Sequence, residues 1–121
     1  MTALEGIRVL DFTRVLAGPY CTLVLGDLGA EIIKIETPHG GADTRGFNFS
    51  PTLDFSSYSL AVNRNKKSVA IDIRTTEGRD AIHAMATNAD VVIENYRSGV
   101  MERYGIGYDD LARVNSQLIF A

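Results

Sequence analysis

Short apolar runs alternate with amphipathic stretches along this chain, and the alternation is clearest over residues 7–36. The runs around Val9 and Ile33 are too short and too apolar for anything but buried strands of a parallel sheet. Between them, Gly18 lets the chain turn, and Pro19 suits the first position of a helix, where its missing N–H costs nothing. The apolar positions of that helix recur at three- and four-residue steps, and they are Tyr20, Leu23, Val24 and Leu28. The pattern predicts a strand, a helix and a second strand, with the apolar side of the helix covering one face of the sheet.

The same alternation continues to the end of the chain. Apolar runs predict three more strands, over residues 68–73, 90–94 and 117–121, and amphipathic stretches between them predict helices. Residues 58–62 fit either a short helix or an extended segment. Residues 37–57 are rich in Gly, Pro, Ser and Thr and predict a long loop. We therefore expect an open α/β, Rossmann-like fold with a mainly parallel five-stranded sheet and flanking helices.

The last predicted strand occupies the final residues of the sequence. In open α/β sheets the loops at the carboxyl ends of the strands form the ligand-binding crevice, so a further loop is expected after residues 117–121. We therefore expect residues 1–121 to be one truncated domain, with part of the functional site absent from this chain.

Composition narrows the classes of protein to consider. The 121 residues suit one domain, and a hydrophobic content of 45% supplies a core. A net charge of −3 provides no overall basic field, which argues against non-specific nucleic-acid binding. The single cysteine, Cys21, excludes an internal disulfide framework, and no apolar run approaches the ~20 residues of a membrane span. We expect a cytoplasmic protein that binds neither nucleic acid nor membrane and whose partners are small molecules or proteins.

Basic residues are concentrated where a phosphate group could bind. Arg64, Lys66, Lys67 and Arg74 place four of the twelve basic residues within eleven positions. A basic run beside a strand can hold a phosphate by charge and through backbone amides, although a solvated turn at a sheet edge has the same composition. Arg45, in the predicted loop, could pair with an anion or simply be exposed.

Other kinds of site are disfavoured. The two histidines, His39 and His83, have no second ligand at zinc spacing, so no metal site is expected. Glu36 lies where a Rossmann domain places its ribose-binding acid, yet the first turn reads VLAGP and lacks the G-x-G-x-x-G that admits a pyrophosphate. Asp11 is expected to hydrogen-bond neighbouring loop amides rather than to act in catalysis.

Six segments, in order, carry a family resemblance. They are VLDFTRVLAGP, LGDLGAEIIKIE, GGADTR, NRNKKSVAIDI, DVVIENYRSGVMERYGIGYDDL and a terminal N-x-x-LIFA. Over nearly all 121 residues the chain resembles the N-terminal part of the family III CoA-transferases. That group includes formyl-CoA transferase and carnitine-type CoA-transferases, and α-methylacyl-CoA racemase is a close relative.

The resemblance implies a Rossmann-like domain that binds the nucleotide end of coenzyme A, in a homodimer of interlocked subunits. The implied substrates are an acyl-CoA and a carboxylic acid, with no metal. In the family's transferases the nucleophile is an aspartate that would lie beyond residue 121, so no catalytic residue is expected in this chain. The positions that resemble the family's CoA contacts are Val15, Leu16, Ile71, Arg74, Asn95, Tyr96 and Arg103.

Two positions depart from the family pattern. Thr37 stands where some members have a phosphate-binding arginine, so Arg45 or Lys66 is expected to supply that charge instead. Leu16 stands where formyl-CoA transferase has a glutamine, which argues against formyl or oxalyl groups as the acyl moiety.

Two alternative functions are compatible with the sequence. The same part of an acyl-CoA racemase is one, although NRNKKS resembles the transferases and racemases often have glycine at the position of Asn65. A non-catalytic CoA- or nucleotide-binding module, complete at this length, is the other. Against it, the chain stops on a predicted buried strand.

Overall fold

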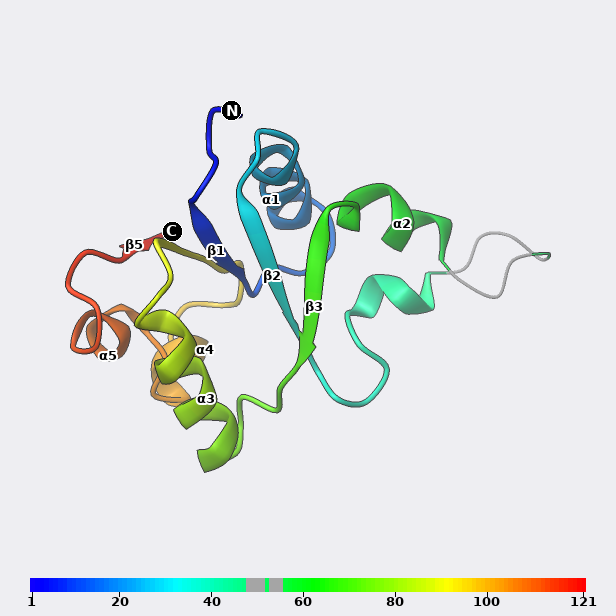
Figure 1. Cartoon of the computed structure of the whole chain (residues 1–121). Helices are drawn as coiled ribbons and strands as arrows, with labels where there is room; N and C mark the ends of the chain where they lie inside the picture. The colour runs from blue at the N-terminus through cyan, green and yellow to red at the C-terminus, as the bar shows by residue number, and fades with distance from the viewer. Residues whose placement is uncertain (48–51, 53–55) are drawn as a thin grey trace.

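The strands of the chain form one parallel sheet in the computed structural model, which describes residues 1–47, 52 and 56–121 (Figure 1). Within that part there are five strands: β1 (Arg8–Asp11), β2 (Glu31–Glu36), β3 (Lys66–Ala70), β4 (Val91–Ile93) and β5 (Ile119–Phe120). Their order is β3-β2-β1-β4-β5, and each neighbouring pair is parallel. The expected open, Rossmann-like sheet is therefore confirmed, although β3 begins at Lys66 instead of residue 68.

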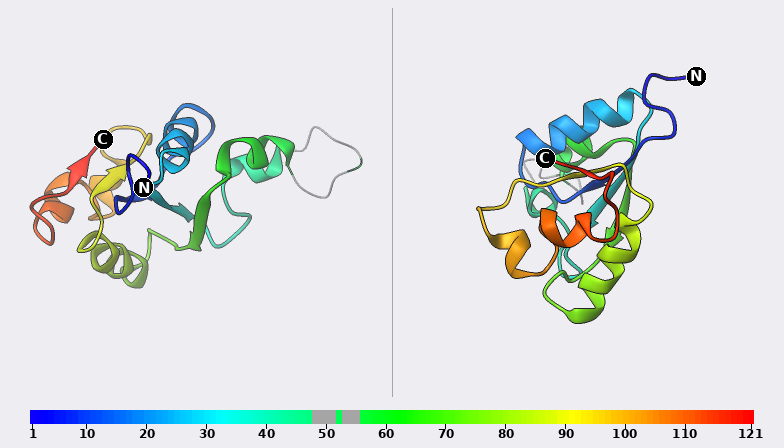
Figure 2. Two further views of the ribbon diagram at one scale, coloured as in Figure 1. Left: turned by 45° about the horizontal axis from the view of Figure 1, so that its top comes forward. Right: turned by 90° about the vertical axis from the view of Figure 1, so that its left-hand side faces the viewer.

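Helices connect the strands and cover both faces of the sheet. They are α1 (Ala17–Asp27), α2 (Ser57–Asn63), α3 (Thr76–Ala86), α4 (Val100–Arg103) and α5 (Tyr108–Ala112), with a short 3₁₀ helix, η1 (Asp43–Gly46). Figure 2 shows α1 and α2 on one face of the sheet and α3, α4 and α5 on the other. None of the helices in the described ranges is long and apolar enough to cross a membrane.

Residues 58–62, which the sequence left undecided, are helical. Ser56 caps α2 because its hydroxyl accepts a hydrogen bond of 3.1 Å from the backbone N–H of Ser59. Of the predicted long loop, residues 48–51 and 53–55 lie outside the described residues, and η1 occupies part of the remainder.

The larger core lies between the sheet and the layer of α3, α4 and α5. Alternate residues of β1 and the residue after it point into this layer, as expected for a strand with period two. Its fully buried side chains include Leu10, Phe12, Ile82, Met101 and Leu111. On the other face a smaller cluster of Val9, Ala30 and Ile32 packs beneath α1.

The predicted apolar face of α1 is wrong. Tyr20, Val24 and Leu28 are 58%, 42% and 45% exposed, and of the four predicted positions only Leu23 is buried. The helix instead turns Thr22 toward the sheet. The sheet is polar at this point because the buried side chains of Asp11, Lys34 and Lys66 meet there, so a hydroxyl fits beneath α1 better than an aliphatic side chain.

Candidate functional site

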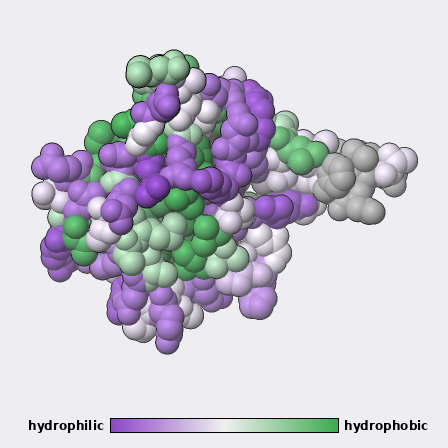
Figure 3. All heavy atoms as spheres, in the orientation of Figure 1, coloured by the Kyte–Doolittle hydropathy of each residue, from purple (hydrophilic) through white to green (hydrophobic). Residues whose placement is uncertain are grey.

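A cavity of about 970 Å³ lies at the carboxyl ends of the parallel strands. Its walls come from the segments that follow β1, β2, β3 and β4, together with α4. The strand order reverses between β1 and β4, and ligands of open α/β sheets bind in the crevice at such a reversal. In Figure 3, hydrophobic residues gather in the middle of the face in view, between the places that β3 and α3 take in Figure 1. Ile71 and Ile73 contribute partly buried apolar walls.

The loop after β1 is fixed by buried charged residues. Asp11 Oδ1 accepts hydrogen bonds from the backbone N–H and the hydroxyl of Thr13, at 2.9 and 2.5 Å. Lys34 Nζ donates to the carbonyl oxygen of Thr13 at 2.9 Å. The expectation that Asp11 binds a neighbouring loop amide is confirmed, and the carboxylate is fully buried.

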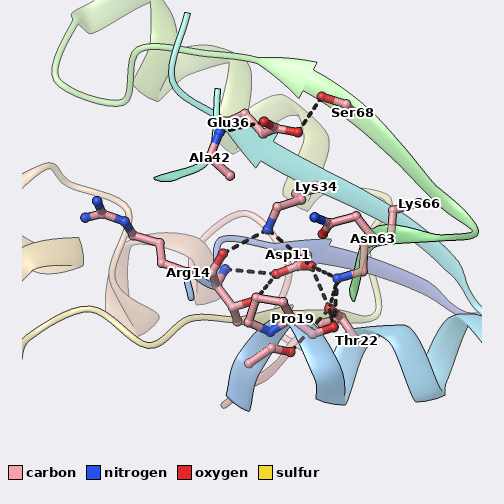
Figure 4. A network of polar contacts seen from close by, with 12 residues as sticks. Asp11, Arg14, Pro19, Thr22, Lys34, Glu36, Ala42, Asn63, Lys66 and Ser68 are labelled. Carbon is pink, nitrogen blue, oxygen red and sulfur yellow. Dashed lines mark hydrogen bonds and ion pairs between the residues drawn. The ribbon is translucent and has the colours of Figure 1, made fainter. Parts of the chain in front are cut away.

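A second lysine completes this buried network. Lys66 Nζ donates to Asp11 Oδ2 at 3.1 Å, to the Pro19 carbonyl at 2.8 Å and to the Thr22 hydroxyl at 2.7 Å. Lys34 Nζ lies 3.9 Å from the same carboxylate oxygen. Figure 4 shows Asp11, Lys34 and Lys66 pointing toward one another from three adjacent strands. Desolvation lowers the pKa of Lys66, and the nearby carboxylate of Asp11 opposes that shift.

The loops after β1 and β4 are joined by a side-chain amide. Asn95 Oδ1 accepts a hydrogen bond of 2.7 Å from the backbone N–H of Arg14, and Asn95 Nδ2 donates at 2.8 Å to the carbonyl of the same residue. The Arg14 guanidinium lies 5.7 Å from the centre of the Tyr96 ring and pairs with Asp43. Burial raises the pKa of Tyr96. Val15, the next residue of the loop, has a backbone φ of 65°.

Glu36 anchors the loop after β2. Its carboxylate accepts hydrogen bonds from Arg45 Nε at 2.6 Å, Arg45 Nη2 at 2.8 Å, the Ala42 backbone N–H at 2.7 Å and the Ser68 hydroxyl at 2.9 Å. These bonds, above all those from Arg45, lower the pKa of Glu36 to about 2. Glu36 lines the cavity and Arg45 does not. The charge of Arg45 is therefore neutralised within the loop.

Of three arginines near the carboxyl ends of β3 and β4, one forms an ion pair with a carboxylate of the described residues and two do not. Arg74 forms a bidentate pair with Asp72, with two hydrogen bonds of 2.8 Å, and this pair lowers the pKa of Asp72 to about 2. Arg97 lines the cavity, and Arg103 lines an adjoining hollow that shares Arg74 with it. Among the described residues, Arg97 and Arg103 are the arginines that form no ion pair. Both are exposed and can receive an anionic ligand.

The structure brings most of the residues expected from the resemblance to one place. The cavity is lined by Val15, Ile71, Arg74, Asn95 and Tyr96, and Arg103 lies in the adjoining hollow.

Three expected residues lie elsewhere. Leu16 is half exposed beyond the lining, Arg45 is bound to Glu36, and Lys66 is buried beneath α1. Arg14 and Arg97 also line the cavity and were not predicted from the sequence. A signal for both was available, because each is basic and lies within a few residues of the end of an apolar strand.

Within the described ranges no group of His, Cys, Asp or Glu is arranged to hold a metal ion.

Fold and cavity together define an α/β domain with a ligand crevice at the reversal of its strand order. The chain belongs to the CoA-transferase family III, whose family model matches residues 4–121. It is 46% identical to mouse succinyl-CoA:glutarate CoA-transferase over 99% of this chain and 28% of the relative. It is 42% identical to succinyl-CoA:mesaconate CoA-transferase of Haloarcula hispanica, over all of this chain and 31% of the relative.

Solved structures agree with this assignment. The crystal structure of Rv3272 from Mycobacterium tuberculosis, in its orthorhombic form, matches with a TM-score of 0.92 and 45% identity, over 98% of this chain and 33% of the other. A CAIB/BAIF family protein from Brucella suis matches with a TM-score of 0.91 and 41% identity, over 98% of this chain and 32% of the other. The chain thus spans about a third of the length of the relatives it matches.

Proposed function

We propose that the cavity binds the nucleotide end of coenzyme A. On this proposal, the chain is the N-terminal part of an enzyme that moves CoA between an acyl-CoA and a carboxylic acid. Family membership and the transferase names of the relatives support this reaction class, and none of the relatives named above is a racemase. The names of the two transferases favour succinyl-CoA as the donor and a dicarboxylic acid as the acceptor.

The observation that carries the proposal is the pair of arginines without an ion pair among the described residues, one lining the cavity and one lining the adjoining hollow. Coenzyme A has a diphosphate and a 3′-phosphate, and guanidinium groups bind phosphate oxygens through paired hydrogen bonds. Arg97 and Arg103 are free to do so, and Arg74 can join them by exchanging the Asp72 carboxylate for a phosphate. The volume of about 970 Å³ lies within the usual range of ligand sites.

The apolar walls suit the uncharged parts of the same ligand. Tyr96 offers an aromatic face to the adenine or the pantetheine arm, and Ile71 offers an aliphatic one. The loop of Val15 provides backbone groups at the opposite wall.

Catalysis is assigned to a part of the enzyme beyond residue 121. Asp11 is buried between two lysines and Asp43 is paired with Arg14, so neither carboxylate is free to attack a thioester. We expect no acyl transfer by the 121-residue chain, and detectable transfer would contradict this assignment. The full-length enzyme is proposed to be a cytoplasmic, interlocked homodimer.

Calorimetric titration of the 121-residue chain tests the proposal. We expect CoA to bind, dephospho-CoA to bind more weakly, and Arg97→Ala to weaken CoA binding by roughly tenfold, because a charge-assisted hydrogen bond is lost. Arg113→Ala is the matched control, since Arg113 pairs with Asp110 outside the cavity lining and its removal should leave affinity unchanged. Binding of NAD in preference to CoA, or no binding of CoA, would contradict the proposal.

A further inference from the structure

Val15 has a backbone conformation that its side chain disfavours. Its φ of 65° lies in the left-handed region, which β-branched residues rarely adopt. Such a conformation persists only where the surrounding structure holds it in place, and it is concentrated at ligand-binding sites. Val15 lies in the cavity wall, in the loop between β1 and α1.

The two residues before Val15 are held entirely by side chains of other residues. The N–H and carbonyl of Thr13 bind Asp11 and Lys34, and the N–H and carbonyl of Arg14 both bind Asn95. All four backbone polar groups ahead of the strained residue are therefore fixed. The loop has little freedom to relax toward a conformation that suits valine better.

Packing on the other side of Val15 restricts the loop further. The Thr13 side chain lies against Gly18, where an added Cβ would be only 2.3 Å from the Cβ of Thr13. The loop is thus held in place by packing between its first residues after β1 and the first turn of α1.

Asn95 connects the loops after β1 and β4, the two strands between which the strand order reverses. It follows β4, whereas Asp11 lies on β1 and Lys34 on β2. Its carbonyl oxygen and its amide nitrogen both bind Arg14, which leaves the side chain less able to bind a ligand directly. Asn95 is exposed, so its side chain is not part of the hydrophobic core.

We propose that Asn95 is a positioning residue that holds Val15 in its left-handed conformation and so sets the wall of the cavity that faces the ligand. The role in ligand binding rests on the proposed CoA site, whereas the coupling between Asn95 and Val15 does not. Glycine adopts positive φ without strain, so in Val15→Gly the loop should keep access to this conformation without Asn95.

A double-mutant cycle without ligand tests the coupling. Asn95→Ala should lower the Tm of the chain by roughly 5 °C in the Val15→Gly background, and by less than half as much in the parent chain, where the release of strain at Val15 offsets part of the lost hydrogen bonding. Asn115→Ala is the matched control, because Asn115 also donates to two backbone carbonyls, of Ala86 and Ala89, away from the cavity. It should lower Tm equally in both backgrounds. Equal shifts for Asn95→Ala in the two backgrounds would overturn the proposal, whether or not CoA binds.

CoA titration of the same variants tests the consequence for binding. Asn95→Ala should weaken CoA binding at least threefold, and less than 1.5-fold in the Val15→Gly background, whereas Asn115→Ala should not change it. The same fold loss in both backgrounds would mean that Asn95 contacts the ligand directly, and would overturn the positioning role. Asn95→Asp, which keeps the acceptor for the Arg14 N–H but loses the donor, provides a milder variant with an intermediate expected effect.

Discussion

The amine of Lys66 lies 3.1 Å from Oδ2 of Asp11, and the two side chains are 2% and 0% exposed. A charge pair this deeply buried is costly to break, because the remaining partner stays buried with part of its charge unmatched. Lys34, at 3.9 Å, would be the nearest cation left to Asp11.

Lys66→Met should lower the free energy of unfolding by about 3–5 kcal/mol, measured by urea denaturation. The adjacent Lys67→Met is the control, because Lys67 is exposed and its pair with Glu31 lies at the surface, where such pairs contribute about 0–1 kcal/mol. Similar losses for the two variants would show that the buried network does not stabilise the fold.

Gly18→Ala should destabilise the chain by about 1–3 kcal/mol, because the new Cβ would collide with Thr13, whose own position is fixed by Asp11 and Lys34. Thermal denaturation measures the effect. Gly46→Ala, where an added Cβ has nothing within 4 Å, is the control and should change stability little. An unchanged Tm for Gly18→Ala would mean that the loop is looser than its hydrogen bonds indicate.

Glu36→Gln should lower stability at neutral pH by on the order of 1–2 kcal/mol, because the ionised carboxylate accepts four hydrogen bonds. The pKa of Glu36 is about 2 in the folded chain, against 4.5 for an unperturbed glutamate. A carboxyl group with a lowered pKa stabilises the fold above about pH 4.5, and that stabilisation is lost as the pH falls toward 2.

The difference in stability between the parent chain and Glu36→Gln should therefore shrink on acidification, as followed by urea titrations at several pH values. Glu5→Gln, at an exposed position near the N-terminus, should match the parent chain throughout. A difference that does not change with pH would contradict the lowered pKa of Glu36.

The exposure of α1 can be tested by comparing its two sides. Leu23→Ala should cost about 2–4 kcal/mol, because Leu23 is buried. Val24→Ala removes a similar apolar group from an exposed position and should change stability by less than about 0.5 kcal/mol. Equal losses in denaturation experiments would mean that Val24 is covered in solution.

The sheet could be predicted from the sequence because buried parallel strands produce short apolar runs with turn residues between them. The apolar pattern of α1 gave a wrong prediction, since periodicity shows that one side of a helix is apolar without showing what that side faces. The missing information was the polar patch beneath the helix. A lysine within EIIKIE and an aspartate within RVLDF interrupt otherwise apolar strands, but their pairing depends on strand register, which the sequence alone does not display.

The site was predicted in part for a related reason. Residues that follow strand ends, such as Asn95 and Arg74, converge in any parallel sheet, so their meeting was foreseeable. Whether a basic residue is free or already paired depends on neighbours distant in sequence. Lys66 reaches Asp11 across 55 positions, and Arg14 reaches Asn95 across 81, so neither contact follows from local pattern.

The distribution of amines has a chemical consequence if the cavity binds an acyl-CoA thioester, as proposed above. The chain has three lysines, and the amines of Lys34 and Lys66 are buried in hydrogen bonds. Lys67 is exposed, but it is not among the described residues that line the cavity, where the basic residues are arginines and His39. Guanidinium groups stay protonated and do not attack acyl groups at neutral pH. A thioester held in the cavity would meet no free lysine, so acylation of amines should be confined to Lys67 and the N-terminus, where mass spectrometry would find it.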